Sequence, residues 1–349
     1  MMNLNTIEEI KKLDHSTGVS VQGVFVLKKK AVKTAKNDST YLSLEYGDRT
    51  GHFHSFCFGD NPIYARIESI PEGSPVFVEL VTGVYQGRSS PRLKETRLLS
   101  KTELANPDLS ARLVETSLEN ADELWVEFQT IVQEIEHKEL RRTVELAIEE
   151  IETEFRTTPA AVAMHHAYRH GLLEHTVHMA RACKVLLPLY PEVEPSLAMA
   201  GLLLHDIGKV VEYEGKLSVS KSKTGILQGH VVLGYRMVRK AGMLAKLNDR
   251  LLERLEHIIL SHQGELEWGA AAMAATAEAV FVSLIDNLDA RMGMVQYALR
   301  HRSEDKTFSD FLPGLKTPVL TEPVHEESLD TKDMDLAPKD LQDTLDFKS

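Results

Sequence analysis

The chain has 349 residues, of which 43% are hydrophobic, and it carries a net charge of −12 at pH 7. This length allows two domains, each with its own hydrophobic core, and no apolar run approaches the roughly 20 residues of a membrane span. The acidic balance argues against a surface that coats nucleic acid broadly, and two cysteines without a Cys-x-x-Cys pair argue against a disulfide framework, so we expect a cytoplasmic protein.

Residues 1–17 are expected to be a short lead-in, and residues 18–102 follow a β pattern. Alternation of apolar and polar residues predicts five strands, and a short helix is expected between the third and the fourth, at Ile63–Ser69. Five short strands with one inserted helix are typical of a small closed barrel of the OB type. The predicted strands are Val19–Leu27, Tyr41–Tyr46, Phe53–Phe58, Pro75–Tyr85 and Pro91–Leu99.

The predicted barrel is basic within an acidic protein, with 12 Lys or Arg residues against eight acids. Positive charge for phosphates and rings on which bases stack are what a single-strand binder needs. The alternative is that most of these rings fill the barrel core. The candidate nucleic-acid-binding residues are Tyr41, Phe53, Phe56, Phe58, Tyr85 and Arg88.

The remainder of the chain is predicted to be helical up to about residue 303. Apolar residues three or four apart predict a helical linker over residues 103–160, and a helical domain is expected over residues 161–303. Residues 212–229, which contain Gly, Ser and Lys, predict a loop or small hairpin. Residues 304–349 are expected to form an acidic, disordered tail.

Histidines and aspartates recur within the helical domain at intervals that predict a metal site. The adjacent pair His205-Asp206 follows an apolar run, and the successive gaps of 30, 25, 32 and 24 residues suit one ligand per helix of a bundle. Imidazole and carboxylate without thiolate suit Mn, Fe, Co, Ni or Zn in a catalytic site, and this number of ligands could hold one or two ions. The candidate ligands are His175, His205, Asp206, His230, His262 and Asp286.

Two further groups of residues are candidates for the same site. Lys209 follows Asp206 by about one helical turn and would neutralise phosphate charge in a transition state, which makes Asp206 and Lys209 the candidate catalytic pair. The alternative for Lys209 is an ordinary lysine at a helix end. His165 and His166 precede the first ligand and could line the pocket, and His178, three residues after His175, could support it.

The order His175, His205-Asp206, Asp286 resembles that of the HD-domain metal-dependent phosphohydrolases, and His230 and His262 match the extra ligands of their binuclear members. Together with the preceding barrel, residues 18–300 resemble the YhaM-type 3′–5′ exoribonucleases. Each matching stretch is short, and the combination is the specific signal. Besides His165-His166, the stretches are Gly171–His175, Thr224–His230, Ser261–Gly264 and Asp286–Ala290.

This resemblance implies a multidomain fold, an all-β OB-type barrel followed by an all-α HD bundle. It implies a nuclease that degrades single-stranded RNA, with single-stranded DNA as a further substrate, to mononucleotides with Mn²⁺. It also makes Gln263, Asn287 and Asp289 pocket candidates. Gln263 departs from the family, in which a histidine often stands there, and implies a weaker second metal or a single one.

Two other functions remain open from the sequence: an HD phosphohydrolase acting on a small nucleotide, and a non-catalytic single-strand-binding protein. The intact set of candidate ligands argues against the second. No partner beyond nucleic acid is expected, and the oligomeric state is left open.

Overall fold

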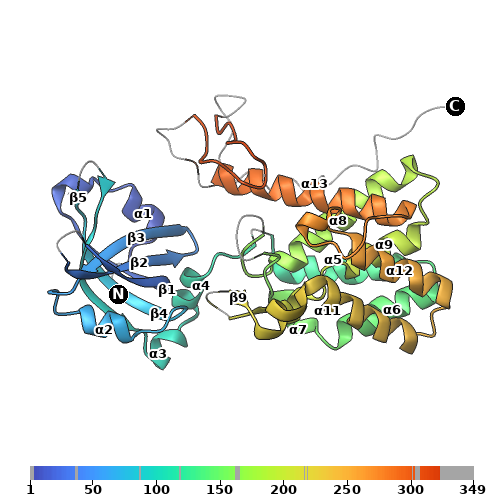
Figure 1. The fold of residues 1–349 in the computed structure, drawn as a ribbon, viewed down its shortest axis with the longest axis horizontal. Helices are drawn as coiled ribbons and strands as arrows, with labels where there is room; N and C mark the ends of the chain where they lie inside the picture. The colour runs from blue at the N-terminus through green and yellow to red at the C-terminus, as the bar shows by residue number, and fades with distance from the viewer. Residues whose placement is uncertain are drawn as a thin grey trace. The chain divides into compact units, whose positions relative to one another are not determined.

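The computed structural model describes residues 4–35, 38–85, 88–117, 119–161, 166–215, 217, 219–300, 302 and 307–322. The chain divides into two compact units, Met1–Gly293 and Met294–Ser349. The first unit contains a β-barrel, drawn in blue to teal in Figure 1, and a helical bundle, drawn in green to orange. The predicted order of an OB-type barrel followed by helices is confirmed.

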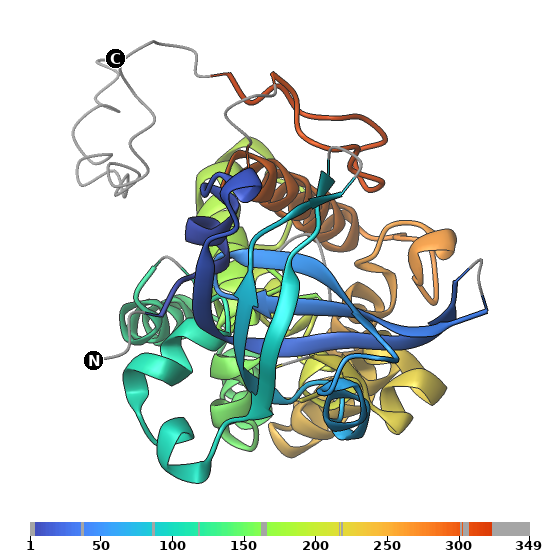
Figure 2. The ribbon, with the colours of Figure 1, turned by 90° about the vertical axis from the view of Figure 1, so that its left-hand side faces the viewer.

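Five strands close the barrel in the order β1-β2-β3-β7-β4, and Figure 2 shows them crossing one another. Successive side chains of a strand point to opposite faces, and in β2 the alternate residues Leu42, Leu44 and Tyr46 fill the interior. A parallel pairing of Phe56 with Arg92 joins β3 to β7. The strands are β1 Ser20–Thr34, β2 Thr40–Asp48, β3 Gly51–Phe58, β4 Pro75–Val81 and β7 Arg92–Leu98.

Two of the predicted strands differ in extent from the observed ones. β1 continues to Thr34 because its first half pairs with β4 and its second half with β2, past an irregularity between Leu27 and Lys29. β4 ends at Val81, and the residues expected to prolong it form a separate ribbon of β5 (Val84–Tyr85) with β6 (Arg88–Ser89). The apolar pattern continues across this break, so periodicity alone could not locate it.

The first residues of the chain, expected as a plain lead-in, include a helix that belongs to the barrel. Helix α1 (Ile7–Lys11) begins at a capping box between Thr6 and Glu9. Ile7 and Ile10 are buried in the barrel core, and the backbone N–H of Ile7 donates to Asp48 Oδ2 at 2.8 Å. The 3₁₀ turn η1 (His15–Thr17) follows, and the predicted inserted helix is observed as α2 (Tyr64–Ser69).

After the barrel, α3 (Lys101–Leu104) and α4 (Pro107–Leu113) lead to the bundle, and α4 packs on β1 and β2. The helices α5 to α7, predicted as a linker, contribute Leu124, Phe128 and Phe155 to the same core as α8 to α12. They therefore form part of the bundle. Their bounds are α5 Ala121–Glu134, α6 Lys138–Glu149 and α7 Glu152–Thr157.

Helix α9 is the centre of the bundle and is apolar on all sides, as expected for a helix surrounded by others. Every residue from Ser196 to Leu204 is buried. The hairpin of β8 (Tyr213–Glu214) and β9 (Ser220–Lys221) lies where a loop or hairpin was predicted. The helices are α8 Gly171–Leu186, α9 Pro195–Leu204, α10 Lys209–Glu212, α11 Lys223–Leu244, α12 Asp249–Ser261 and α13 Ala277–Arg300, with the 3₁₀ turns η2 Leu187–Leu189 and η3 Leu266–Trp268.

The second unit begins within α13 and, among its described residues, contains two antiparallel bridges, Phe308 with Leu320 and Leu312 with Thr317. Residues 323–349, where most of the acidic tail was expected, lie outside the described residues. Across the described parts of the chain, none of the helices combines the length and the apolar character needed to cross a membrane.

Candidate metal centre

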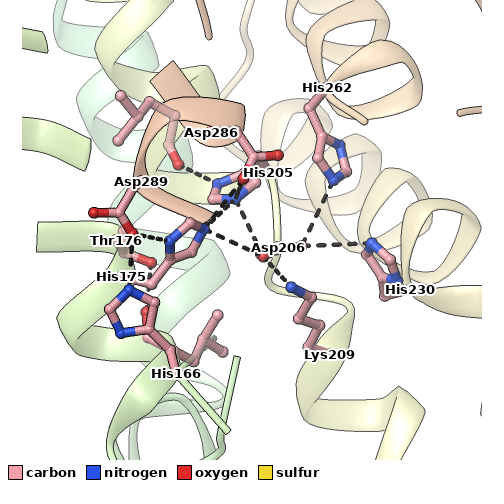
Figure 3. A network of polar contacts seen from close by, with 12 residues as sticks. His166, His175, Thr176, His205, Asp206, Lys209, His230, His262, Asp286 and Asp289 are labelled. Atoms are coloured by element: carbon pink, nitrogen blue, oxygen red, sulfur yellow. Dashed lines mark hydrogen bonds and ion pairs between the residues drawn. The ribbon is translucent and has the colours of Figure 1, made fainter. Parts of the chain in front are cut away.

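The six candidate ligands converge in the bundle although they come from five helices and the turns beside them (Figure 3). They come from α8, the end of α9 and the turn after it, α11, the end of α12, and α13. Four of them are almost completely buried, with exposed fractions of 0–2%. The ligand residues are His175, His205, Asp206, His230, His262 and Asp286, and the four almost completely buried ones are His175, His205, Asp206 and His262.

One half of the cluster combines two imidazoles with two carboxylates. His175 Nε2 lies 3.3 Å from His205 Nε2 and 3.4 Å from Asp286 Oδ1. Asp206 Oδ2 lies 3.2 Å from His205 Nε2 and 3.7 Å from His175 Nε2. The His175, His205 and Asp206 atoms have the spacing of a ligand set around one divalent ion, and Asp286 lies beside them. We call these four residues the first half.

The other carboxylate oxygen of Asp206 faces a second pair of imidazoles, which we call the second half. Asp206 Oδ1 lies 3.5 Å from His230 Nε2 and 3.6 Å from His262 Nε2. Among the described residues, this buried oxygen has no hydrogen-bond partner. Because an unpartnered buried oxygen is costly, and because the imidazole nitrogens beside it are ordinary metal ligands, the arrangement fits a divalent ion. Asp206 is thus placed to bridge two ions.

All four histidines are oriented in the same way, with Nδ1 engaged outside the cluster and Nε2 directed into it. His205 Nδ1 donates to the carbonyl of Leu202 and His262 Nδ1 to that of Ile259, each at 2.7 Å. The carboxylates of Asp289 and Glu212 accept from the other two, at 2.6 Å from His175 and 2.9 Å from His230. These bonds fix the tautomer that leaves the Nε2 lone pair free to bind a metal.

Lys209 points into the same cluster. Its Nζ lies 2.5 Å from Asp206 Oδ2, and its side chain is buried, unlike that of an ordinary lysine at a helix end. Burial acts to raise the pKa of Asp206, but Lys209 and the neighbouring imidazoles hold that pKa well below its usual value. Asp206 is therefore ionised, as a bridging ligand must be.

The first half also holds a bound proton when no cation is present. Burial acts to lower the pKa of His175, but hydrogen bonds to Asp286 and Asp289 and their negative charge raise it to about 10. A divalent ion has to displace this proton, because only the neutral imidazole has a lone pair on Nε2.

A set of buried and half-buried polar residues surrounds the first half and holds Asp289. Its Oδ2 also accepts from His166 Nε2 at 2.9 Å, and its Oδ1 lies 3.7 Å from His178 Nδ1. His178 in turn lies 2.5 Å from Glu119, and Glu119 is bound by Arg181. Burial opposes the charge on Asp289, but its histidine partners hold its pKa far below the usual range.

Two supporting acids were not singled out from the sequence as part of the site. Glu212 is separated from His230 by the β8–β9 hairpin, so no helical spacing connects the two. Glu174 lies beside His175 and accepts a hydrogen bond from the hydroxyl of Tyr168. An acid after the apolar run Gly171–Leu173 is unusual enough to have signalled a buried role.

The structure corrects or limits several of the predicted positions. Asn287 is half-buried and accepts from Arg291 Nε at 2.6 Å, and the contacts of the described residues include none between Asn287 and the six ligands. Phe53 lies on the inner face of β3, where its ring contacts those of Phe25 and Tyr46, so it belongs to the barrel core. Outside the described parts lie residue His165 and the side chains of Tyr85 and Arg88.

Three of the predicted aromatic residues do gather on the outside of the barrel. Phe56 and Phe58 are about half exposed, at 43% and 52%. The ring of Tyr41 lies 5.8 Å from that of Phe56 and 5.6 Å from that of Phe58. We call these three residues the aromatic patch.

Two glycines set the position of the second half. Gly229 interrupts α11 with a φ of 70°, a conformation that strains other residues, and the helix resumes at His230. The backbone at Gly208 passes so close to the carbonyl of His230 that a Cβ would overlap it. The turn that carries Asp206 is thereby packed directly against the backbone that carries His230.

Comparison with known proteins identifies the family of the domain that contains the cluster. The HD domain family matches residues 172–291, a range that contains all six ligands. A 3′–5′ exoribonuclease YhaM of Listeria innocua is 30% identical over 321 residues, which cover 91% of this chain and 100% of that protein. The chain belongs to the YhaM family. The YhaM protein of Bacillus subtilis is also 30% identical, over 82% of this chain and 89% of its own length. Because these YhaM alignments extend well beyond the HD match, the family likeness includes residues outside the metal centre.

Proposed function

We propose that the chain is a metal-dependent 3′–5′ exoribonuclease that removes mononucleotides from single-stranded RNA. One observation carries the proposal. Asp206 is buried and ionised, and it directs one oxygen to each of two histidine pairs. That arrangement lies within a family whose named members are 3′–5′ exoribonucleases.

The proposed division of work follows from the contacts. His175, His205, Asp206 and Asp286 hold one ion, and His230, His262 and Asp206 hold a second. Bound divalent ions supply an activated water and neutralise charge on the phosphodiester. Lys209 adds a positive charge beside Asp206, where the charge of the transferring phosphate would develop. Asp289 and Glu212 keep the imidazoles of His175 and His230 aligned.

The aromatic patch is the proposed contact for the strand. Bases stack on exposed rings whatever their identity, and this mode of binding does not read the 2′-hydroxyl. Positive charge lies nearby, because strand β1 carries Lys29 and Lys33 and pairs with strand β2, which carries Tyr41. We therefore propose binding without base preference and include single-stranded DNA as a second substrate.

Manganese is the proposed ion. The ligands are imidazoles and carboxylates, a mixture that suits Mn²⁺, and Co, Fe, Ni and Zn remain the other candidates. We also keep the cytoplasm as the proposed compartment, since both cysteines are buried free thiols.

The deciding assay incubates the purified protein and Mn²⁺ with 5′-labelled single-stranded RNA and, separately, with free mononucleotides. Stepwise shortening of the labelled strand, absent from an Asp206→Ala preparation, is expected. Hydrolysis of mononucleotides with intact RNA would support the small-nucleotide phosphohydrolase instead. Binding of RNA without cleavage would support the non-catalytic single-strand binder.

A further inference from the structure

Gln263 lies directly against the imidazoles of the second half. Its side-chain nitrogen is 3.2 Å from His230 Nε2 and 3.1 Å from His262 Nε2. Both imidazoles use their Nδ1 hydrogen elsewhere, on Glu212 and on the carbonyl of Ile259. Their Nε2 atoms are therefore lone-pair acceptors, and the amide lies where the two lone pairs converge.

The two halves differ in the groups they offer to an ion. The first half has two imidazoles and the carboxylates of Asp206 and Asp286. The second has two imidazoles, its share of Asp206 and a neutral amide. An ion in the second half would therefore have one carboxylate fewer among its ligands.

An amide has two ends with opposite chemistry. Its NH₂ group donates to imidazole nitrogens, whereas its oxygen is a hard ligand of the kind that suits Mg²⁺ and Mn²⁺. A half-turn of the terminal amide exchanges the two ends within the same space. The group that satisfies both imidazoles in the absence of an ion can thus become a ligand in its presence.

We propose that Gln263 is a ligand of the second metal, through its amide oxygen, and that it makes this metal the weakly held, exchangeable one. This inference rests on the proposed two-metal centre. The occupancy of the second half then follows the concentration of free divalent ion, while the first half stays filled. Gln263 thus sets the affinity of the second half for its ion.

The test measures metal content and affinity directly, without RNA. The wild-type chain, loaded with Mn²⁺ and dialysed, is expected to keep close to one ion, and calorimetric titration is expected to show a second, weaker binding step. Gln263→His should keep close to two ions. Gln263→Ala should weaken the second step by at least about tenfold, the size of effect seen even for groups outside the ligand shell.

A matched control is Gln133→His, which makes the same replacement on the exposed side of α5. It is expected to bind metal as the wild type does. The Gln263→Ala result gives the sign that decides the inference. If the amide only blocks the second half, its removal would tighten the second step, and if the amide faces away, nothing would change; either result overturns the proposal.

The same titrations separate this inference from the proposed function. A chain that binds no divalent ion at all, with circular dichroism showing it folded, would refute the metal centre itself. Two tight and equal steps in the wild type would leave the metal-dependent nuclease intact and refute only the role of Gln263.

Discussion

The barrel carries its candidate functional residues on its surface, whereas the bundle encloses its candidate functional residues in its interior. The barrel core is formed by residues such as Phe25, Leu42 and Tyr46, and the aromatic patch lies outside it. The bundle encloses its polar cluster, with His205 and Asp206 buried directly after the apolar helix α9. Binding and stability are therefore separable in the barrel, whereas in the bundle the same residues affect both.

Enclosure has a physical cost that the bundle offsets by pairing. A buried charge is tolerated only where it is paired or coordinates a metal. Asp206 is paired with Lys209, and Asp289 with three histidines. Removing one member of such a pair leaves the charge of its partner buried and uncompensated. Removing an exposed ring of the barrel leaves no buried charge behind.

The largest expected effect is that of Asp206→Ala. It removes the one carboxylate that, within the described parts of the chain, faces both halves. RNA hydrolysis should therefore fall by at least about a thousandfold, since metal ions supply several kcal/mol of stabilisation and each 1.4 kcal/mol is tenfold in rate. Binding of RNA by the barrel should persist. Single-turnover cleavage and a filter-binding assay measure the two, and wild-type turnover in excess Mn²⁺ would show that the centre is wrongly assigned.

Asp289→Asn is expected to weaken the binding of the first metal, although Asp289 is not itself a proposed ligand. The charge that makes His175 a stronger ligand is lost, and changes in such supporting residues typically cost 10–100-fold in metal affinity. Titration with Mn²⁺ should show the loss in the tighter step alone. A loss confined to the weaker step would contradict the pairing of Asp289 with the first half.

Two phenylalanines of the same strand sharpen the comparison. Phe53→Ala should lower the free energy of unfolding by roughly 2–4 kcal/mol, since its ring packs on the barrel core. Phe58→Ala should leave stability within about 0.5 kcal/mol and raise the KM for long RNA about tenfold, in line with the loss of one stacked base. Denaturant unfolding and steady-state kinetics measure the two effects. A loss of stability in Phe58→Ala together with a raised KM in Phe53→Ala would mean that the inner and outer faces of β3 are wrongly assigned.

The smallest expected effect is that of Asn287→Ala. This residue is next to the ligand Asp286 in sequence, but it bonds Arg291 on the outside of the helix. Metal content, kcat and KM should all stay at wild-type values. A tenfold change in any of them would mean that α13 presents a different face to the cluster.

The sequence was sufficient to predict the barrel and the bundle, because strand and helix periodicities are local. It also picked out the histidines and aspartates that converge in the bundle, because they follow apolar runs. It could not place Glu212, whose contact with His230 crosses a hairpin. It could not tell that Phe53 is a core residue and Phe58 a surface residue either. Both are aromatic residues of one strand, and the difference depends on which face of the strand points into the barrel. Nor could it decide whether Asn287 shares the facing of Asp286, because adjacency in sequence turns a helical side chain by roughly 100°.

Helix α1 has a consequence for the order of events during synthesis. Its five residues are too few for a stable helix in water, and its partners Asp48 and Thr50, and the strands that close the barrel, are made later. The end of β7 at Leu98 follows Lys11 by 87 positions. At a synthesis rate of about 5–20 residues per second, the strands that bury Ile7 and Ile10 are complete roughly 4–17 seconds after α1 is made. During this interval both side chains are open to chaperones and proteases.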